Sequence, residues 1–313
     1  MTRLVILPPN EQLAFNNPSK LNPSKRASYF SLTFEIMDFI KTLKTPTNQV
    51  GFVLQLGYFR ANGKFFTAQQ FKSADINFVL KILNILPTEL NFSTYIKKIP
   101  TDHRKKILEL LQWQPLDLDN QEKLRAHIQW QIPQHISPKR VFYAGIEYCC
   151  HNKVELPSYH LLASFITEAY NVVENNYILE ITQKLNTEQR EKLDHILKPA
   201  ARDETEESPL PSFTYLKKIN QSLRPMDIRE SAKDFELFKN YFNIFASILN
   251  DLNMSDQMTE YYATWTQKAT LFQLNQFPNP YKSYLHLLCY IKHQFYVRHD
   301  LLVDILLKSS KTV

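Results

Sequence analysis

Glycine is scarce in this sequence: the chain has 4 Gly among 313 residues, against 17 Pro. So few glycines argue against a β-protein rich in tight turns and against a glycine-dependent dinucleotide-binding α/β domain. Hydrophobic residues make up 44% of the chain, which is enough to bury sizeable cores. Together with helical apolar spacing over most of the chain, this composition predicts an all-α fold in two or three modules.

Cysteines and long apolar runs are also few. The three cysteines are an adjacent pair, Cys149 and Cys150, and the distant Cys289, which do not form a disulfide framework. The N-terminal apolar run is too short for a signal peptide, and no segment approaches about 18 uninterrupted apolar residues. We therefore expect a soluble cytoplasmic protein with no membrane partner.

The net charge of +6 is concentrated in the first third of the chain. Residues 1–113 carry 15 Lys and Arg against 7 Asp and Glu, whereas residues 114–200 carry 9 against 11 and residues 201–313 carry 13 against 13. This asymmetry indicates a polyanionic partner for the first third. Ordinary solvated surface on a basic protein is the alternative from charge alone.

Prolines, capping residues and a change of composition divide the chain. The first two dozen residues are rich in Pro and Asn and are expected to be extended, and helical patterns follow. Among these helices, one is expected to be capped by Thr101, and others to begin at Pro138 and at Pro157, the last with a break near Asn175. The acidic stretch "ARDETEESPLPS" has Leu210 as its one large apolar residue and is the best candidate for a linker. The predicted organisation is a basic helical module at 1–115, a second helical module at 116–200, a linker at 201–212 and a helical region at 213–313.

The stretch from Gly57 to Lys64 resembles a phosphate-cradling loop. That motif needs four residues between its glycines and a Ser or Thr after Gly-Lys, because the hydroxyl holds magnesium. Here five residues separate Gly57 from Gly63, and Phe65 takes the place of the hydroxyl. No strand pattern precedes the stretch, so nucleotide binding is not expected there.

A buried helix explains the same stretch better. Apolar residues cover it nearly all round, so Gly51 and Gly57 would permit close approach of neighbouring helices. Pro46 suits the first turn after a Thr45 cap, and Gly63 would end the helix in a left-handed conformation. The side chains left free to meet a ligand lie near the two ends: Asn48, Gln49, Arg60 and Lys64.

No catalytic or metal-binding pattern stands out. Cys149, Cys150 and His151, with His160 nearby, offer metal ligands, but adjacent cysteines on a helix point about 100° apart and no second pair exists. Buried cysteines beside a histidine at a helix end are the favoured interpretation. We therefore predict no catalytic residue, no metal ligand, no cofactor and no small-molecule substrate in this chain.

Basic clusters stand where helices are expected to begin. Cations at a helix start oppose the helix dipole, so helix stability alone would not select them. They can instead neutralise phosphates, although exposed charges with no ligand remain the alternative. The candidate DNA contacts are Lys25, Arg26, Asn48, Gln49, Arg60, Lys64, Lys97, Lys98, His103, Arg104, Lys105, Lys106, Lys139 and Arg140.

Four stretches, in the right order, resemble the N-terminal region of Tn3-family transposases. They are "NQVGFVLQLGYFRANGKF", "HRKKILELLQWQPL", "SPKRVFYAGIEYCCHNKVELPSYHLLASFI" and the segment 261–307. By resemblance, that region is a set of helical modules, some similar to helix-turn-helix domains, that bind the terminal inverted repeats of a transposon. The catalytic region of such transposases holds an Asp/Asp/Glu centre with magnesium, and no such triad is evident in this sequence.

The resemblance implies a sequence-specific binder of double-stranded DNA in transposition, associated with the bacterial nucleoid when bound. Strand cleavage by this chain alone is not expected, and magnesium is expected in a catalytic half. Two alternatives remain open: a helical protein-interaction module, meeting the catalytic region of a transposase or a second copy, and a truncated regulator of transposition without cleavage activity.

Overall fold

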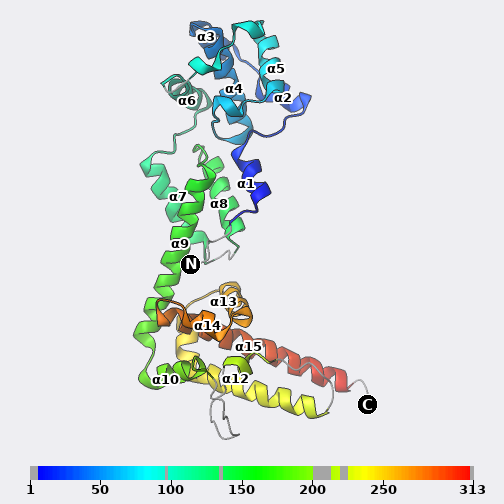
Figure 1. Ribbon diagram of the computed structural model, residues 1–313, viewed down its shortest axis with the longest axis vertical. Helices are drawn as coiled ribbons and strands as arrows, with labels where there is room; N and C mark the ends of the chain where they lie inside the picture. The colour runs from blue at the N-terminus through cyan, green and yellow to red at the C-terminus, as the bar shows by residue number, and fades with distance from the viewer. Residues whose placement is uncertain (1–5, 96–97, 134–136, 200–212, 219–224, 311–313) are drawn as a thin grey trace. The chain divides into compact units, whose positions relative to one another are not determined.

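A computed structural model describes residues 6–95, 98–133, 137–199, 213–218 and 225–310 of the chain (Figure 1). Within these ranges every regular element is a helix, and one isolated bridge joins Gln114 and Val154. The all-α prediction is confirmed. The chain forms two compact units: unit 1 is drawn from residues 1–132 and 137–169, and unit 2 from residues 133–136 and 170–313.

The helices follow one another along the chain. Those that begin in unit 1 are α1 (Pro9–Asn16), α2 (Pro23–Tyr29), α3 (Phe34–Thr42), α4 (Pro46–Asn62), α5 (Ser73–Leu83), α6 (Lys98–Leu111), α7 (Leu118–Gln131), α8 (Pro138–His151) and α9 (Tyr159–Lys184), with single 3-10 turns at Ala68–Gln70, Pro87–Glu89 and Phe92–Thr94. Unit 2 adds α10 (Thr187–Ile196), α11 (Phe213–Leu216), α12 (Pro225–Asp251), α13 (Asp256–Lys268), α14 (Leu271–Asn275) and α15 (Pro280–Ser310).

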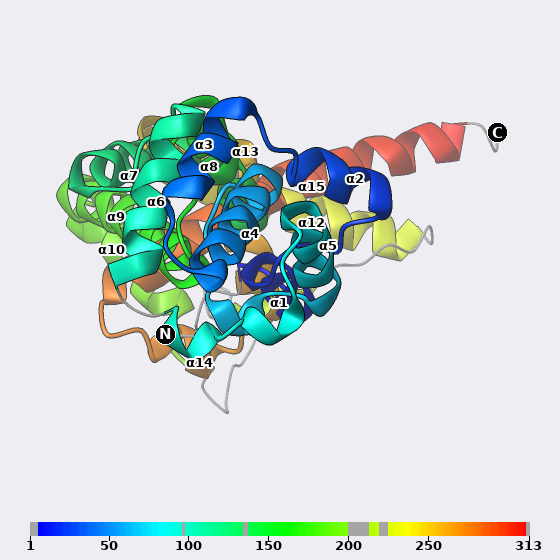
Figure 2. The ribbon, with the colours of Figure 1, turned by 90° about the horizontal axis from the view of Figure 1, so that it is seen from above.

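Helix α4 is the central helix of an N-terminal bundle, α2–α6. Its start is fixed by Thr45, whose side chain accepts a hydrogen bond from the backbone N–H of Asn48, and by Pro46 in the first turn. It ends at Gly63, which has φ +67° and donates its N–H to the carbonyl of Phe59 at 2.7 Å. Helices α2, α3, α5 and α6 pack around it (Figures 1 and 2), as expected for a helix that is apolar nearly all round.

Two glycines of α4 allow aromatic rings to lie against its backbone. A Cβ atom at Gly51 would stand closer than 3.0 Å to the ring of Tyr95, and one at Gly57 closer than 3.0 Å to the ring of Phe30. Both rings are buried. These glycines serve close packing, as expected, but the groups that lie nearest to them are aromatic rings and not the backbones of neighbouring helices.

The first two dozen residues are not extended as expected, because they contain α1 and the start of α2. Proline at the first helical position costs no hydrogen bond, and both helices use it: Pro9 in α1 and Pro23 in α2. Asn22 caps α2 by accepting a hydrogen bond from the backbone N–H of Lys25. The prolines therefore start helices here and do not prevent them.

A backbone joint connects the N-terminal bundle to the second bundle of unit 1, formed by α7, α8 and the first turns of α9. The backbone N–H of Gln114 donates to the carbonyl of Lys153 at 2.7 Å, and the carbonyl of Gln114 accepts a hydrogen bond from the N–H of Glu155 at 2.9 Å. Leu156 donates its N–H to the carbonyl of Gly63 at 2.9 Å. The short segment after α8 is therefore tied to the ends of both α4 and α6.

Helix α9 is continuous from Tyr159 to Lys184, although a start at Pro157 and a break near Asn175 were expected. Its residues 159–169 belong to unit 1 and its residues 170–184 to unit 2. The chain therefore divides at residue 169. The module boundaries expected from sequence stay predictions, and the expected linker at 201–212 lies outside the described residues.

Unit 2 is built on α12 and α15, which lie side by side (Figure 1). The rings of Phe242 and Phe295 stack between them with centroids 4.4 Å apart. Arg298 of α15 pairs with Asp234 of α12 at 3.1 Å and donates a second hydrogen bond to the carbonyl of Leu216 in α11. Helices α13 and α14 also pack on α15.

Candidate nucleic-acid interface

Arg26 holds α2 against α5 through a buried carboxylate. Its Nε lies 2.6 Å from Asp75 of α5, whose side chain is fully buried. The hydroxyl of Tyr58 in α4 donates a hydrogen bond to the same carboxylate at 2.9 Å and accepts one from the N–H of Lys72 at 3.0 Å. Burial raises the pKa of Tyr58. Arg26 therefore ties three helices together.

The cations at the end of α4 are held by backbone carbonyls. Arg60 donates to the carbonyls of Tyr29 at 3.1 Å and Ser31 at 2.6 Å, and burial lowers its pKa. Lys64 is 8% exposed. Its ammonium donates to the backbone carbonyl of Phe15 and lies 3.5 Å from the centre of the Phe15 ring. Burial lowers the pKa of Lys64 to about 8. The expectation that Lys64 is free to meet a ligand is therefore wrong.

The polar residues at the start of α4 are half-buried. Gln49 donates its side-chain amide to the carbonyl of Leu43 at 3.0 Å, which leaves its side-chain oxygen without a hydrogen bond within the described ranges. The backbone N–H of Asn48 bonds the Thr45 cap, while its side chain makes no hydrogen bond to the part of the chain that the structure describes. DNA contact through these two residues stays a prediction.

Helix α6 begins at Lys98, three residues before the expected cap Thr101, because proline is tolerated in a first turn and Pro100 lies there. His103 is consequently in the second turn. It is 3% exposed, its Nδ1 lies 2.9 Å from the hydroxyl of Tyr95, and its ring meets Phe52 edge-on. Burial of this kind removes His103 from the accessible surface.

Two of the remaining cations of α6 are engaged in ion pairs. Arg104 directs both Nε and Nη2 to Glu155, with the Nε at 2.9 Å from the carboxylate, and burial raises the pKa of that acid against the opposing effect of Arg104. Lys106 pairs with Glu109 at 2.8 Å. Lys105 is exposed. Lys97 lies outside the described residues, and nothing is described of the Lys98 side chain.

The basic start of α8 is partly occupied by α1. Lys139 pairs with Glu11 of α1 at 2.6 Å, and the Tyr143 hydroxyl donates to the same carboxylate at 3.4 Å. Pairing with Glu11 raises the pKa of Lys139. Arg140 beside it is exposed and forms no ion pair with any described residue. The predicted helix start at Pro138 is confirmed.

Unpaired cations lie at more positions of unit 1 than the clusters in the sequence indicated. We define the cationic set as the exposed Lys and Arg of this unit with neither an ion pair nor a side-chain hydrogen bond to any described residue. Three of its members were predicted, and four are single lysines that an analysis of clusters cannot find. The cationic set is Lys20, Lys25, Lys44, Lys81, Lys105, Arg140 and Lys153.

The profile of a family described as "Domain of unknown function (DUF4158)" matches residues 6–169 of the chain. The chain belongs to this family. The DUF4158 region ends at the residue that closes unit 1, Ala169, and it contains the entire cationic set. It carries 19 Lys and Arg against 13 Asp and Glu.

A likeness to a transposase accompanies the family match. The chain is 21% identical over 171 residues to the "Transposase for transposon Tn1546" of Enterococcus faecium. The aligned stretch covers 54% of this chain and 17% of that transposase. The interpretation as a transposase-related N-terminal region is confirmed by these two findings, and the narrower Tn3-family assignment is compatible with them.

Acidification is expected to destabilise the DUF4158 region through His103. Burial lowers the pKa of this histidine to about 4 from 6.5, against a smaller opposing effect of Asp102. The folded state therefore favours the neutral ring: its contribution to stability is complete above pH 6.5 and falls as the pH decreases from 6.5 to 4. The loss should be about 3 kcal/mol in the free energy of unfolding.

The matched variants are His103→Gln and His160→Gln, the second at an exposed position of α9. Urea unfolding at several pH values, with hydrogen exchange of α4 as the readout, measures how the free energy of unfolding depends on pH. His103→Gln should lose stability at pH 7 and show a flatter pH profile, whereas His160→Gln should follow the wild type. Equal profiles for His103→Gln and the wild type would contradict this account.

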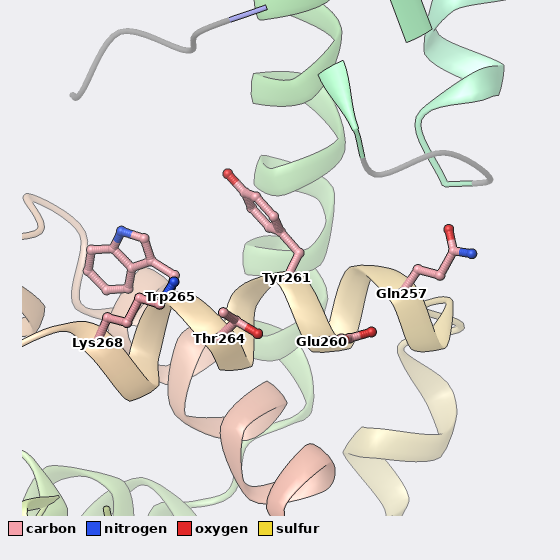
Figure 3. Close-up of a pocket in the computed structure, with 6 residues that line it drawn as sticks. All are labelled: Gln257, Glu260, Tyr261, Thr264, Trp265 and Lys268. Atoms are coloured by element: carbon pink, nitrogen blue, oxygen red, sulfur yellow. The ribbon is translucent and has the colours of Figure 1, made fainter. Parts of the chain in front are cut away.

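Outside the DUF4158 region, a shallow hollow of about 400 Å³ lies on one face of α13 (Figure 3). Its described lining carries one acid and one cation, Glu260 and Lys268, so its charge does not favour a polyanion. Tyr261 and Trp265 project from the same side of the helix. The hollow resembles a site for an apolar partner more than a nucleic-acid contact.

The cysteines of α8 do not form part of a metal cluster in the described ranges, where no group of three or more His, Cys, Asp and Glu is placed to hold an ion. Cys149 is buried, which raises its pKa to about 12, and Cys150 is exposed. No described helix combines the length and apolarity needed to cross a membrane.

Proposed function

We propose that the DUF4158 region binds double-stranded DNA at the terminal inverted repeats of a transposon, as the N-terminal part of a Tn3-family transposase. The observation that carries this proposal is the cationic set of unit 1. A lysine or arginine with no acidic partner in the folded chain can bind a phosphate without first breaking an ion pair. The likeness to a transposase supports DNA as the polyanion.

The predicted contacts differ in how available they are. Lys25, Lys105 and Arg140 are exposed without an acidic partner, so we assign them to phosphates. Arg104 and Lys139 are exposed but paired, and each would have to exchange a carboxylate for a phosphate. Lys64 and His103 are both buried, so we assign them to stabilising the folded region and not to DNA contact.

Strand cleavage belongs, in this proposal, to another region of the transposase. The likeness covers 17% of the transposase from Enterococcus faecium, so most of that protein lies outside it. By family resemblance, an Asp/Asp/Glu centre with magnesium is expected in such a region. The DUF4158 region would supply recognition of the transposon end and no cleavage of its own.

Fluorescence polarisation with labelled duplexes tests DNA binding. The full chain should bind the inverted repeat of its own element more tightly than a scrambled duplex. Affinity should fall steeply with salt, with a slope of log K on log salt of roughly −3 to −6 if three to seven cations contact phosphates. Equal affinity for repeat and scrambled duplexes would contradict specific binding, and salt-independent binding would contradict phosphate contacts.

The hollow on α13 favours an additional interaction role for unit 2. Its apolar, nearly neutral lining suits a protein partner, such as the catalytic region of a transposase or a second copy of this chain. Light scattering of the same samples, with and without duplex, separates the two roles: a constant mass of one chain in both would speak against self-association.

A further inference from the structure

We infer that α5 is the helix that reads base pairs, with Ser73, Asn77 and Lys81 facing the major groove and α2 placed against the adjacent phosphates. This inference rests on the proposed function, because it takes double-stranded DNA as the partner. It goes beyond the proposed function by naming the helix that gives DNA binding its sequence preference. Three independent features of α2 and α5 lead to it.

The first feature is a polar, unoccupied face on α5. Ser73, Asn77 and Lys81 are four residues apart and therefore form one stripe along the helix. All three are exposed, and their side chains form no hydrogen bond or ion pair within the described part of the chain. Val79 and Leu80 of α5 are buried, and the helix packs on α4.

The second feature is the absence of exposed acid from α2 and α5. Their single carboxylate, Asp75, is fully buried and paired with Arg26. Helix α1 carries only the half-buried Glu11. Five other helices of unit 1 each expose at least one carboxylate: α3, α6, α7, α8 and α9. Those carboxylates are Glu35 and Asp38 on α3, Asp102 and Glu109 on α6, Asp119 and Glu122 on α7, Glu147 on α8 and Glu168 on α9. Glu168 pairs with Arg125, so among the described residues a DNA backbone would meet an unpaired carboxylate at α3, α6, α7 and α8 and none at α2 and α5.

The third feature is a border of cations around the same face. Lys25 is exposed on α2, which lies beside α5 through the Arg26–Asp75 pair (Figures 1 and 2). Lys20 is exposed and lies near the start of α5, since its charge adds to the larger effect of burial in lowering the pKa of Lys72, the residue before that helix. The Lys72 ammonium itself donates to the carbonyl of Pro18. Phosphates beside the groove would therefore meet the ammonium groups of Lys20 and Lys25.

These side chains have the chemistry that the major groove requires. Asparagine can bond the N6 and N7 atoms of adenine in a bidentate manner, and lysine can donate to O6 and N7 of guanine. Helix α5 is about 16 Å long, which exceeds the width of a groove of about 12 Å. Cations beside the helix then fix its register through phosphates but carry no sequence information.

The test separates base reading from phosphate binding. Duplexes recovered by the wild-type chain from a random-sequence pool serve as probes, with scrambled duplexes beside them. Asn77→Ala should bind the recovered duplex roughly 5- to 150-fold more weakly, relax the preference at one base pair and leave the salt slope unchanged. Lys25→Ala should weaken binding to all duplexes alike and reduce the salt slope by about 0.9.

Gln129→Ala is the matched control, because Gln129 is an exposed amide on α7, a helix that also exposes carboxylates. It should bind both kinds of duplex like the wild type. Thermal melting of every variant should be unchanged, because the substituted side chains are exposed. Retention of the full sequence preference by both Asn77→Ala and Lys81→Ala would overturn the assignment of α5 while leaving specific DNA binding intact. A wild-type chain that recovers no preferred sequence would overturn both proposals.

Discussion

Gly57→Leu should prevent the N-terminal bundle from folding. A single Cβ atom at this position would already overlap the ring of Phe30, which is itself fully buried. That ring cannot move aside, because it packs edge-on against Tyr58 and also meets Phe78. Overpacking a tight core with one methyl group costs about 1–3 kcal/mol, and leucine adds three further carbons. Hydrogen exchange of α4 should therefore change from protected to fast.

Two comparisons show whether the effect comes from this contact. Gly145→Ala in α8 places a Cβ 3.2 Å from Leu162, and the gain in helix propensity of up to about 1 kcal/mol should offset that contact. Phe30→Ala combined with Gly57→Ala should be less destabilising than the sum of the two single changes. Wild-type protection of α4 in the Gly57→Leu chain would refute the packing account.

Asp75→Ala should lower the free energy of unfolding of unit 1 by about 3–5 kcal/mol. The change leaves the guanidinium of Arg26 without its counter-charge, although this side chain is 18% exposed, and it removes the acceptor of the Tyr58 hydroxyl. Breaking one side of such a pair costs far more than the pair contributes, because the remaining charge is poorly solvated. Urea unfolding, with hydrogen exchange of α4 and α5 as the readout, measures the loss of unfolding free energy.

An exposed ion pair serves as the comparison for the loss of stability in Asp75→Ala. Asp119→Ala removes the partner of Lys123, at a surface site where both side chains are more than half exposed, and should cost no more than about 1 kcal/mol. Replacing both members of the buried pair, as Arg26→Met with Asp75→Leu, should recover part of the lost stability. If Asp75→Ala is no more harmful than Asp119→Ala, the buried network does not stabilise the bundle as described.

Local signals in the sequence predict some helix boundaries well. The limits of α4 follow from Thr45, Pro46 and Gly63, because capping and the left-handed cap depend on neighbouring residues along the chain. The same holds for α8, which begins at Pro138. Proline signals were less reliable at α6, where Pro100 lies inside the first turn and the helix starts three residues before the expected cap.

The candidate interface was harder to predict, because whether a cation is available depends on residues far away in the sequence. Lys64 is buried by Phe15 of α1, and Arg104 is paired with Glu155. The spacing of charges along the chain contains neither fact. Single exposed lysines such as Lys81 also escape an analysis that looks for clusters, since their importance lies in the absence of acid around them in space.

The backbone joint of unit 1 has a consequence for how this region can diverge. Its three hydrogen bonds run between main-chain atoms of residues 63, 114, 153, 155 and 156, so their donors and acceptors are the same for almost every amino acid. Proline at 114, 155 or 156 is the exception, because it removes the N–H. Positions 63 and 153 are restricted as well, because their positive φ values favour glycine or asparagine. At the remaining positions distant relatives can change the amino acid and keep the architecture of the joint, so a comparison of sequences would understate how well it is preserved.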